Sequence, residues 1–176
     1  MKSLRVGING FGRIGRQVFK IGRAYPELEF VAVNDLTDND TLAHLLKYDS
    51  VFGRFDGEVL AEGDRIVVDG KPLHVFEIRN PAEIPWGEYG VDVVVESTGL
   101  FRSRDKAALH LRDTVQHVVI SAPGKGEPPD FTVVLGVNDH LLDLSRHRVI
   151  SNASCTTNAF APLVKVLHER FRIQKG

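Results

Sequence analysis

The sequence predicts an α/β fold, a doubly wound and mostly parallel sheet with a small antiparallel insertion. Two observations support this prediction. Short apolar runs rich in Val and Ile recur along the 176 residues, and several are continuous rather than alternating, which is typical of strands covered on both faces. Amphipathic helical patterns separate some of these runs. Strands that alternate with helices favour a parallel sheet.

The elements follow in chain order. We expect strands at six apolar runs, at residues 4–8, 30–33, 91–95, 118–120, 133–135 and 149–150. Helical patterns cover 13–23 and 103–111, and the second of these starts at a serine. Residues 58–78 differ, because Asp69-Gly70 is a typical hairpin turn between two short apolar runs. That segment predicts the antiparallel insertion.

Composition and charge exclude several classes of protein. The 22 Lys and Arg residues against 23 Asp and Glu give a net charge of -1, so no basic excess favours nucleic acid or an anionic membrane as a partner. No window approaches the roughly 20 apolar residues of a membrane span, and the start shows no apolar signal segment. The single cysteine cannot form an internal disulfide, which fits a reducing compartment. We therefore expect a cytoplasmic protein.

The first chemical motif is G-x-G-x-x-G at Gly10, Gly12 and Gly15, directly after an apolar strand and before a helix. Glycines there permit a tight turn and let the backbone approach a pyrophosphate at the helix N-terminus. Asp35 lies 20 residues beyond Gly15, where a carboxylate can accept hydrogen bonds from the ribose hydroxyls of NAD and repel the 2'-phosphate of NADP. These residues predict a Rossmann-type NAD site. The alternative is that Asn34-Asp35 only caps a turn.

The second motif surrounds Cys155, the only cysteine in the chain. A helical pattern follows it, and Asn152 or Ser154 can cap the helix. A helix N-terminus favours a thiolate, which is the form that a nucleophile requires. The alternative is a small buried hydrophobe. Pro162, seven residues into the pattern, is expected to kink the helix or delay its regular start.

Together these motifs resemble the glyceraldehyde-3-phosphate dehydrogenase family, in order and in register over essentially the whole chain. The matching segments are N-G-F-G-R-I-G at 9–15, N-D at 34–35, V-V-E-S-T-G at 94–99, S-A-P at 121–123 and S-N-A-S-C-T-T-N at 151–158. The resemblance implies a glycolytic enzyme that oxidises glyceraldehyde 3-phosphate with NAD and inorganic phosphate. Cys155 would attack the aldehyde, hydride transfer to NAD would leave a thioester, and phosphate would cleave it.

The resemblance also implies the residues of the site, with no metal among its ligands. Ser154 and Thr156 would bind substrate. The residues implied for the cofactor are Asn9, Gly10, Gly12, Arg13, Ile14, Asp35, Arg79, Thr98, Gly99 and Ser121. Within that set, the backbone of Arg13 and Ile14 would contact the pyrophosphate, and Arg79 would lie on the adenine side. Without the family, Arg79 reads equally well as a solvated charge and Thr98 as a turn residue.

The resemblance divides the chain at Ser151. Residues 1–151 would form the dinucleotide-binding domain, and 152–176 would begin a catalytic domain. In the family, a histidine on a strand after the helix of Cys155 activates the thiol, and this sequence ends at Gly176 before that strand. His168 lies 13 residues past Cys155, which is about 20 Å along a continuous helix. The other six histidines read as surface or helix residues. We therefore expect little dehydrogenase activity from these 176 residues alone.

Other assignments remain open. The family forms homotetramers, but the oligomeric state of this chain does not follow from its sequence. Erythrose-4-phosphate dehydrogenase shares the nucleophile motif, and turnover on the two sugars would distinguish the enzymes. A non-catalytic NAD-binding module is the third possibility, and a Cys155 thiol that alkylates no faster than free cysteine would favour it.

Overall fold

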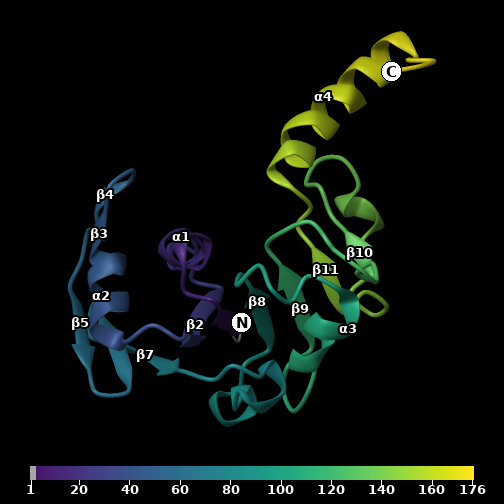
Figure 1. Cartoon of the computed structure of the whole chain (residues 1–176). Coiled ribbons are helices and arrows are strands. Elements are labelled where there is room, and N and C mark those ends of the chain that lie inside the picture. The colour runs from purple at the N-terminus through teal and green to yellow at the C-terminus, as the bar shows by residue number, and fades with distance from the viewer. Residues whose placement is uncertain (1–2) are drawn as a thin grey trace.

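Figure 1 shows the computed structural model of the chain, which describes residues 3–176. The strands are β1 (Leu4–Asn9), β2 (Leu28–Asn34), β3 (Tyr48–Asp49), β4 (Gly53–Arg54), β5 (Val59–Glu62), β6 (Arg65–Val68), β7 (Lys71–Phe76), β8 (Val93–Glu96), β9 (His117–Ile120), β10 (Phe131–Thr132) and β11 (Val149–Ser151). The helices are α1 (Arg13–Gly22), α2 (Asn39–Lys47), α3 (Arg104–Ala107) and α4 (Cys155–Phe171). Four 3-10 turns complete the described elements, η1 (Pro81–Glu83), η2 (Trp86–Tyr89), η3 (Ala108–His110) and η4 (Asp139–Leu141).

One nine-stranded sheet organises the chain, in the order β10-β11-β9-β8-β1-β2-β7-β6-β5. The pairs from β10 to β7 are parallel, whereas β7-β6 and β6-β5 are antiparallel. The predicted fold class is therefore confirmed. The antiparallel hairpin extends the main sheet, because β7 pairs with β2. A separate two-stranded antiparallel sheet joins β3 to β4.

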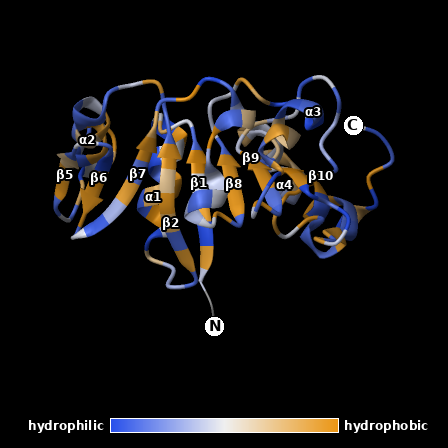
Figure 2. Cartoon of the chain, turned by 90° about the horizontal axis from the view of Figure 1, so that it is seen from below, coloured by the Kyte–Doolittle hydropathy of each residue, from blue (hydrophilic) through white to orange (hydrophobic). Residues whose placement is uncertain are grey.

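Figure 2 shows that the strands of the parallel sheet are largely hydrophobic, and hydrophobic clusters cover both faces of the sheet at β2, which suits its continuous apolar run. Successive side chains of a strand point to opposite faces, and on β2 the neighbours Ala32 and Val33 pack into different hydrophobic clusters. The cluster with Val33 includes Phe19 of α1 and Leu42 of α2. The cluster with Ala32 includes Trp86 of η2. This two-sided burial anchors the strand ends that carry the candidate site.

Three local predictions differ from the structure. The strand expected at 133–135 lies instead at Phe131–Thr132, because the Asn138 side chain donates to Thr132 O and accepts from Val134 N, which turns the chain. The helix expected at 103–111 divides into α3 and η3. α2 lies outside the predicted elements, although Asp38 caps it by accepting from Thr41 N at 2.8 Å.

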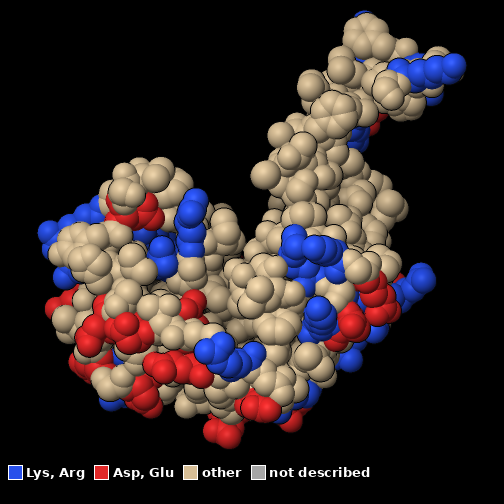
Figure 3. Space-filling view, viewed as in Figure 1, with Lys and Arg blue, Asp and Glu red and all other residues tan. Residues whose placement is uncertain are grey.

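α4 projects away from the sheet (Figures 1 and 3). It begins at Cys155 and continues through Pro162, so the predicted delay of its start is wrong. None of its residues is buried, and Phe160, Leu163 and Phe171 are more than half exposed. Among residues 3–176, no helix combines the length and the apolar character that crossing a membrane requires.

Asp130 ties the edge of the sheet to α3. One carboxylate oxygen accepts from Arg148 N at 2.9 Å and Val149 N at 2.8 Å, at the start of β11, and the other accepts from Arg104 Nε at 2.7 Å. Burial alone raises the pKa of this carboxyl, but the hydrogen bonds from Val149, Arg104 and Arg148 together outweigh it and hold the pKa below its usual value. Asp130 thereby helps to place β11, the strand that leads to Cys155.

We expect Asp130→Asn to lower the free energy of unfolding by about 2 kcal/mol at pH 7, the scale of hydrogen bonds to a charged group. A carboxylate whose pKa is depressed by folding contributes its stability above the unfolded pKa of about 3.9 and loses it as pH falls through the folded pKa. The difference between wild type and variant should therefore shrink below about pH 4 in urea unfolding. Asp56→Asn, at an exposed loop carboxylate, is the control. A difference that stayed constant down to pH 3 would contradict this account.

Candidate functional site

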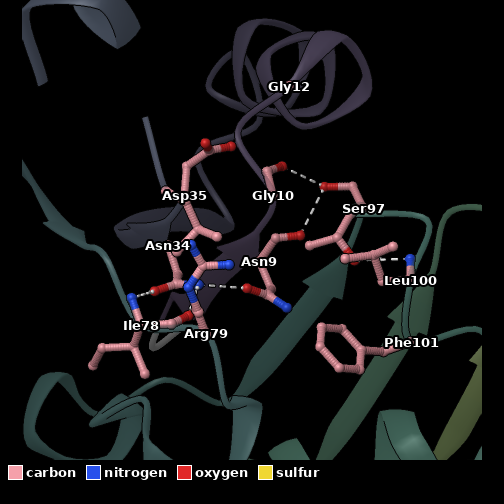
Figure 4. A pocket seen from close by; sticks show the side chains of 12 residues that line it. Asn9, Gly10, Gly12, Asn34, Asp35, Ile78, Arg79, Ser97, Leu100 and Phe101 are labelled. Atoms are coloured by element: carbon pink, nitrogen blue, oxygen red, sulfur yellow. Dashed lines mark hydrogen bonds between the residues drawn. The ribbon is translucent and has the colours of Figure 1, made fainter. Parts of the chain in front are cut away.

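The candidate site is a pocket at the carboxyl ends of the parallel strands, with a cavity volume of about 330 Å³ (Figure 4). β1 pairs with β2 on one side and with β8 on the other, so the chain order reverses there. Ligands of open α/β sheets bind in the crevice at such a switch point. The lining residues are Asn9, Gly10, Gly12, Asn34, Asp35, Leu36, Ile78, Arg79, Ser97, Thr98, Leu100 and Phe101.

The glycine loop between β1 and α1 forms one side of the pocket. Gly10 has φ 90°, and a Cβ atom there would lie 2.6 Å from Thr98 N. At Gly15 a Cβ would lie 2.1 Å from Gly10 O, so only glycine lets α1 pack this closely. Around the Cβ position of Gly12, by contrast, nothing lies within 4 Å. The loop therefore packs against the protein at Gly10 and Gly15 and leaves open space at Gly12, where a pyrophosphate can approach.

Asp35 follows β2 and holds the glycine loop from the side. One carboxylate oxygen accepts from Phe11 N at 2.7 Å, and the other accepts from Thr37 N at 3.1 Å. The bond to Thr37 is the turn cap that we considered as an alternative role for Asp35. Asp35 caps this turn and also lines the pocket. Because an ionised carboxylate can accept about four hydrogen bonds, both oxygens retain capacity for ribose hydroxyls.

Two arginines, Arg13 and Arg16, lie in the first turn of α1. Arg13 and Ile14 form its exposed first turn, which contains no acidic residue. Arg16 donates to Phe11 O at 3.0 Å and so braces the loop. Burial lowers the pKa of the Arg16 guanidinium, while the carboxylates of Asp49 and Asp35 oppose that change. Together with the helix dipole, the guanidinium groups of Arg13 and Arg16 favour an anionic ligand at the loop.

Two further walls complete the pocket. Ser97 Oγ donates to Gly10 O at 2.7 Å, which fixes the segment after β8 against the loop. On the other side, Asn34 Nδ2 donates to Ile78 O at 2.9 Å, and the exposed Arg79 follows (Figure 4). Sequence reasoning missed Asn34, Leu36, Ile78, Ser97, Leu100 and Phe101 as lining residues. Several of them lie within a few positions of the carboxyl end of β2, β7 or β8, which is the signal that could have indicated them.

The structure brings most, though not all, of the residues implied for the cofactor to this pocket. Asn9, Gly10, Gly12, Asp35, Arg79 and Thr98 line it. Gly99 follows Thr98 on the exposed side of the same segment. Ser121 lies at the end of β9, where its N–H donates to Glu96 O at 3.0 Å. Arg13, Ile14 and Gly99 are next in sequence to lining residues or close to them, and none of Arg13, Ile14, Gly99 and Ser121 lines the pocket.

Cys155 lies beyond the carboxyl end of β11, at the same edge of the sheet. Ala153 adopts a left-handed conformation with φ 58°, which costs a non-glycine residue about 1–2 kcal/mol and turns the chain from β11 toward α4. Ser154 then caps α4 by accepting from Thr157 N at 2.9 Å. Cys155 is the first helical residue and is exposed, as is Thr156. The alternative of a buried hydrophobic cysteine is therefore wrong.

The seven histidines occupy separate positions in the described chain. His44, His74 and His117 lie on α2, β7 and β9, and His140 lies in η4. His147 stacks on Phe131, and His168 lies on α4. His110 is fully buried, which the sequence did not indicate. Within residues 3–176, no group of three or more His, Cys, Asp or Glu side chains could hold a metal ion.

Comparison with known proteins gives consistent matches. A sequence profile described as glyceraldehyde 3-phosphate dehydrogenase, NAD binding domain, matches residues 4–104. Over 174 residues the chain is 58% identical to the glyceraldehyde-3-phosphate dehydrogenase of Geobacillus stearothermophilus, covering 99% of this chain and 51% of that protein. Identity to the Thermotoga maritima protein of the same name is 55% over 174 residues, covering 98% and 51%. The chain thus spans about half the length of the curated relatives it matches.

Proposed function

The chain belongs to the glyceraldehyde-3-phosphate dehydrogenase family, whose cofactor is NAD, and from this premise we propose that it is the nucleotide-binding and nucleophile-bearing part of a phosphorylating dehydrogenase. The reaction would convert glyceraldehyde 3-phosphate and inorganic phosphate to 1,3-bisphosphoglycerate, a step of glycolysis. One observation carries the proposal. The glycine loop, at Gly10 and Gly12, and Asp35 meet in one pocket at the switch point of the sheet, directly before the start of α1.

Each group in or around that pocket would have a role that its chemistry suits. The open space at Gly12 and the N–H groups of Arg13 and Ile14 would receive the pyrophosphate. Asp35 would accept from the adenosine ribose, and its charge would oppose the 2'-phosphate of NADP. Arg79 would contact the adenine side. Thr98, Gly99 and Ser121 would line the strand ends toward the nicotinamide, the group that accepts the hydride.

The exposed thiol of Cys155 is the proposed nucleophile. Its sulfur would bond to the aldehyde carbon as the C=O π pair moves to oxygen. That carbon would then lose a hydride, which NAD would accept when bound, and the carbonyl would re-form as a thioester. A phosphate oxygen would finally bond to the acyl carbon and release the Cys155 thiolate. The first-turn N–H groups of α4 favour negative charge beside the thiol. Ser154 and Thr156 flank it and would contact the substrate. Ser154 Oγ already lies 2.7 Å from Thr157 Oγ1, so hydroxyl groups are gathered at this turn.

The remaining assignments follow as proposals. Residues 1–151 would bind the dinucleotide, and 152–176 would begin the catalytic domain. Residues 1–176 alone would turn over little substrate, since His168, the histidine nearest Cys155 in the following sequence, lies about 20 Å along α4. We place the protein in the cytoplasm, as a homotetramer in its full-length form, without nucleic-acid or membrane partners.

A calorimetric titration of the 176-residue chain with NAD, repeated with NADP, tests the nucleotide half of the proposal. We expect binding of NAD and at least tenfold weaker binding of NADP, because Asp35 would repel the 2'-phosphate; a tenfold difference corresponds to about 1.4 kcal/mol. Equal affinity for both would contradict the role of Asp35. Binding of neither would contradict a working nucleotide site in this chain.

A further inference from the structure

A chain of buried polar groups lies behind the pocket. Trp86 Nε1 lies 3.0 Å from His110 Nδ1, and His110 Nε2 lies 3.2 Å from Glu96 Oε2. Asn9 Nδ2 lies 2.6 Å from the same Glu96 oxygen. The side chains of His110 and Glu96 are 0% exposed. A carboxylate so deeply buried is tolerated only when hydrogen bonds satisfy it, so the identity of each partner matters.

The positions of the hydrogens follow at one end from the indole of Trp86. An indole N–H can only donate, so His110 Nδ1 must accept from it. The imidazole is then neutral and carries its hydrogen on Nε2, which donates to Glu96 Oε2. His110 thus presents a donor to the carboxylate because Trp86 fixes its tautomer.

The other end is fixed by the backbone of Ile78. Its N–H donates to Asn34 Oδ1 at 2.9 Å, so the Asn34 amide group must donate to Asn9 Oδ1, at 2.8 Å. Asn9 Nδ2 is therefore the group that faces Glu96. Two series of hydrogen bonds, one from the indole of Trp86 and one from the backbone N–H of Ile78, therefore converge on Glu96 Oε2.

The second oxygen of Glu96 holds the opposite wall. It accepts from Thr98 N at 2.9 Å and from the Thr98 hydroxyl. The same hydroxyl accepts from Leu100 N at 3.0 Å, and Leu100 lines the pocket. The hydroxyl has a single hydrogen, which it donates to Glu96. This bond orients an oxygen lone pair toward the backbone N–H of Leu100. The wall formed by Thr98 and Leu100 therefore depends on Oε1 of Glu96. The wall that contains Asn34 and Ile78 depends, through Asn9, on Oε2.

We propose that Glu96, held by His110 and Trp86, is a positioning residue that fixes both walls of the nucleotide pocket in the geometry that binds NAD. The inference rests on the proposed function. An ionised carboxylate suits the place because all four of its hydrogen bonds come from donors. A glutamine would direct its own N–H groups at one pair of these donors. Glu96 itself does not line the pocket and acts through Thr98 and Asn9.

The test compares Glu96→Gln with wild type in the complete 176-residue chain labelled with ¹⁵N. The chain contains one tryptophan, so a single indole N–H signal reports the bond between Trp86 and His110. In the variant we expect this signal to move, the Thr98 and Leu100 amides to exchange with solvent at least tenfold faster, and NAD to bind at least tenfold more weakly. An NAD affinity within twofold of wild type, or unchanged exchange, overturns the proposal.

A matched pair at Thr98 keeps the proposal testable if Glu96→Gln does not fold. Thr98→Ser retains the hydroxyl, whereas Thr98→Val replaces it with a methyl group of similar size. We expect the valine variant to bind NAD at least tenfold more weakly than the serine variant, with faster amide exchange at Leu100 in the valine variant alone. Equal affinities of the two variants overturn the proposal.

Val94→Ala is the control for stability, because Val94 lies on β8 two positions before Glu96 and is fully buried in a hydrophobic cluster. If this variant weakens NAD binding as much as Glu96→Gln, the effect is one of stability and the positioning role is wrong. If wild type itself binds no NAD, the proposed function fails. In that case the amide exchange rates and the indole signal still test whether Glu96 positions both walls. If Glu96→Gln changes neither of them, the positioning role is also wrong.

Discussion

Substitution of Gly10 by Ala is expected to abolish NAD binding and to lower the free energy of unfolding by about 3 kcal/mol or more. The new Cβ would lie 2.6 Å from Thr98 N and 2.8 Å from Ser97 C, and neither backbone atom can move away without displacing β8. The backbone at Gly10 also has φ 90°, which Ala rarely adopts. Urea unfolding and calorimetric titration with NAD measure the two losses.

Gly12→Ala is the matched control, because the same methyl group meets no protein atom within 4 Å. Its φ of −72° is ordinary for Ala, so we expect a loss of less than about 1 kcal/mol in stability, the scale of an N-cap change. NAD affinity should nevertheless fall at least tenfold, or about 1.4 kcal/mol, since the methyl would occupy space reserved for the pyrophosphate. Undiminished NAD binding by Gly12→Ala would place the pyrophosphate elsewhere.

The second large effect is expected from Asp35→Asn. The amide oxygen of Asn can still accept one hydrogen bond, from Phe11 N or from Thr37 N, but the amide NH₂ group then faces the other donor. The side chain also lacks the negative charge that strengthens hydrogen bonds from the ribose hydroxyls. Hydrogen bonds to a charged group contribute about 1.5–3 kcal/mol, so NAD affinity should fall by about tenfold to a hundredfold. Affinity for NADP should fall less, because the repulsion of its 2'-phosphate disappears.

Asp38→Asn is the control for this prediction. Asp38 caps α2 three residues further on, lies outside the pocket lining, and asparagine is an equally good cap. We expect its affinities for both nucleotides to equal those of wild type. An Asp35→Asn variant that kept the full preference for NAD over NADP would assign the discrimination to another residue.

Local sequence predicted the nucleotide loop because its chemistry is local. Continuous Val-rich runs mark strands buried on both faces, and the 1-3-6 spacing of Gly10, Gly12 and Gly15 marks a turn that only small residues can form. The same kind of reasoning placed Cys155 near a helix start, since Ser154 is a common cap. It failed at 133–135, where a side chain six positions from Thr132 ends the strand.

The amino-acid sequence by itself thus determined the fold class, the glycine loop and the position of the thiol, all of which depend on neighbours along the chain. Only the tertiary structure decided what stands behind the pocket. Glu96 and Asn9 are 87 positions apart, and His110 reads from sequence as an ordinary helix residue. Their hydrogen bonds exist because β1 and β8 pair side by side while η3 packs against them. The packing of the sheet brings together residues that are far apart in sequence, and such contacts produce no periodic pattern from which the sequence could predict them.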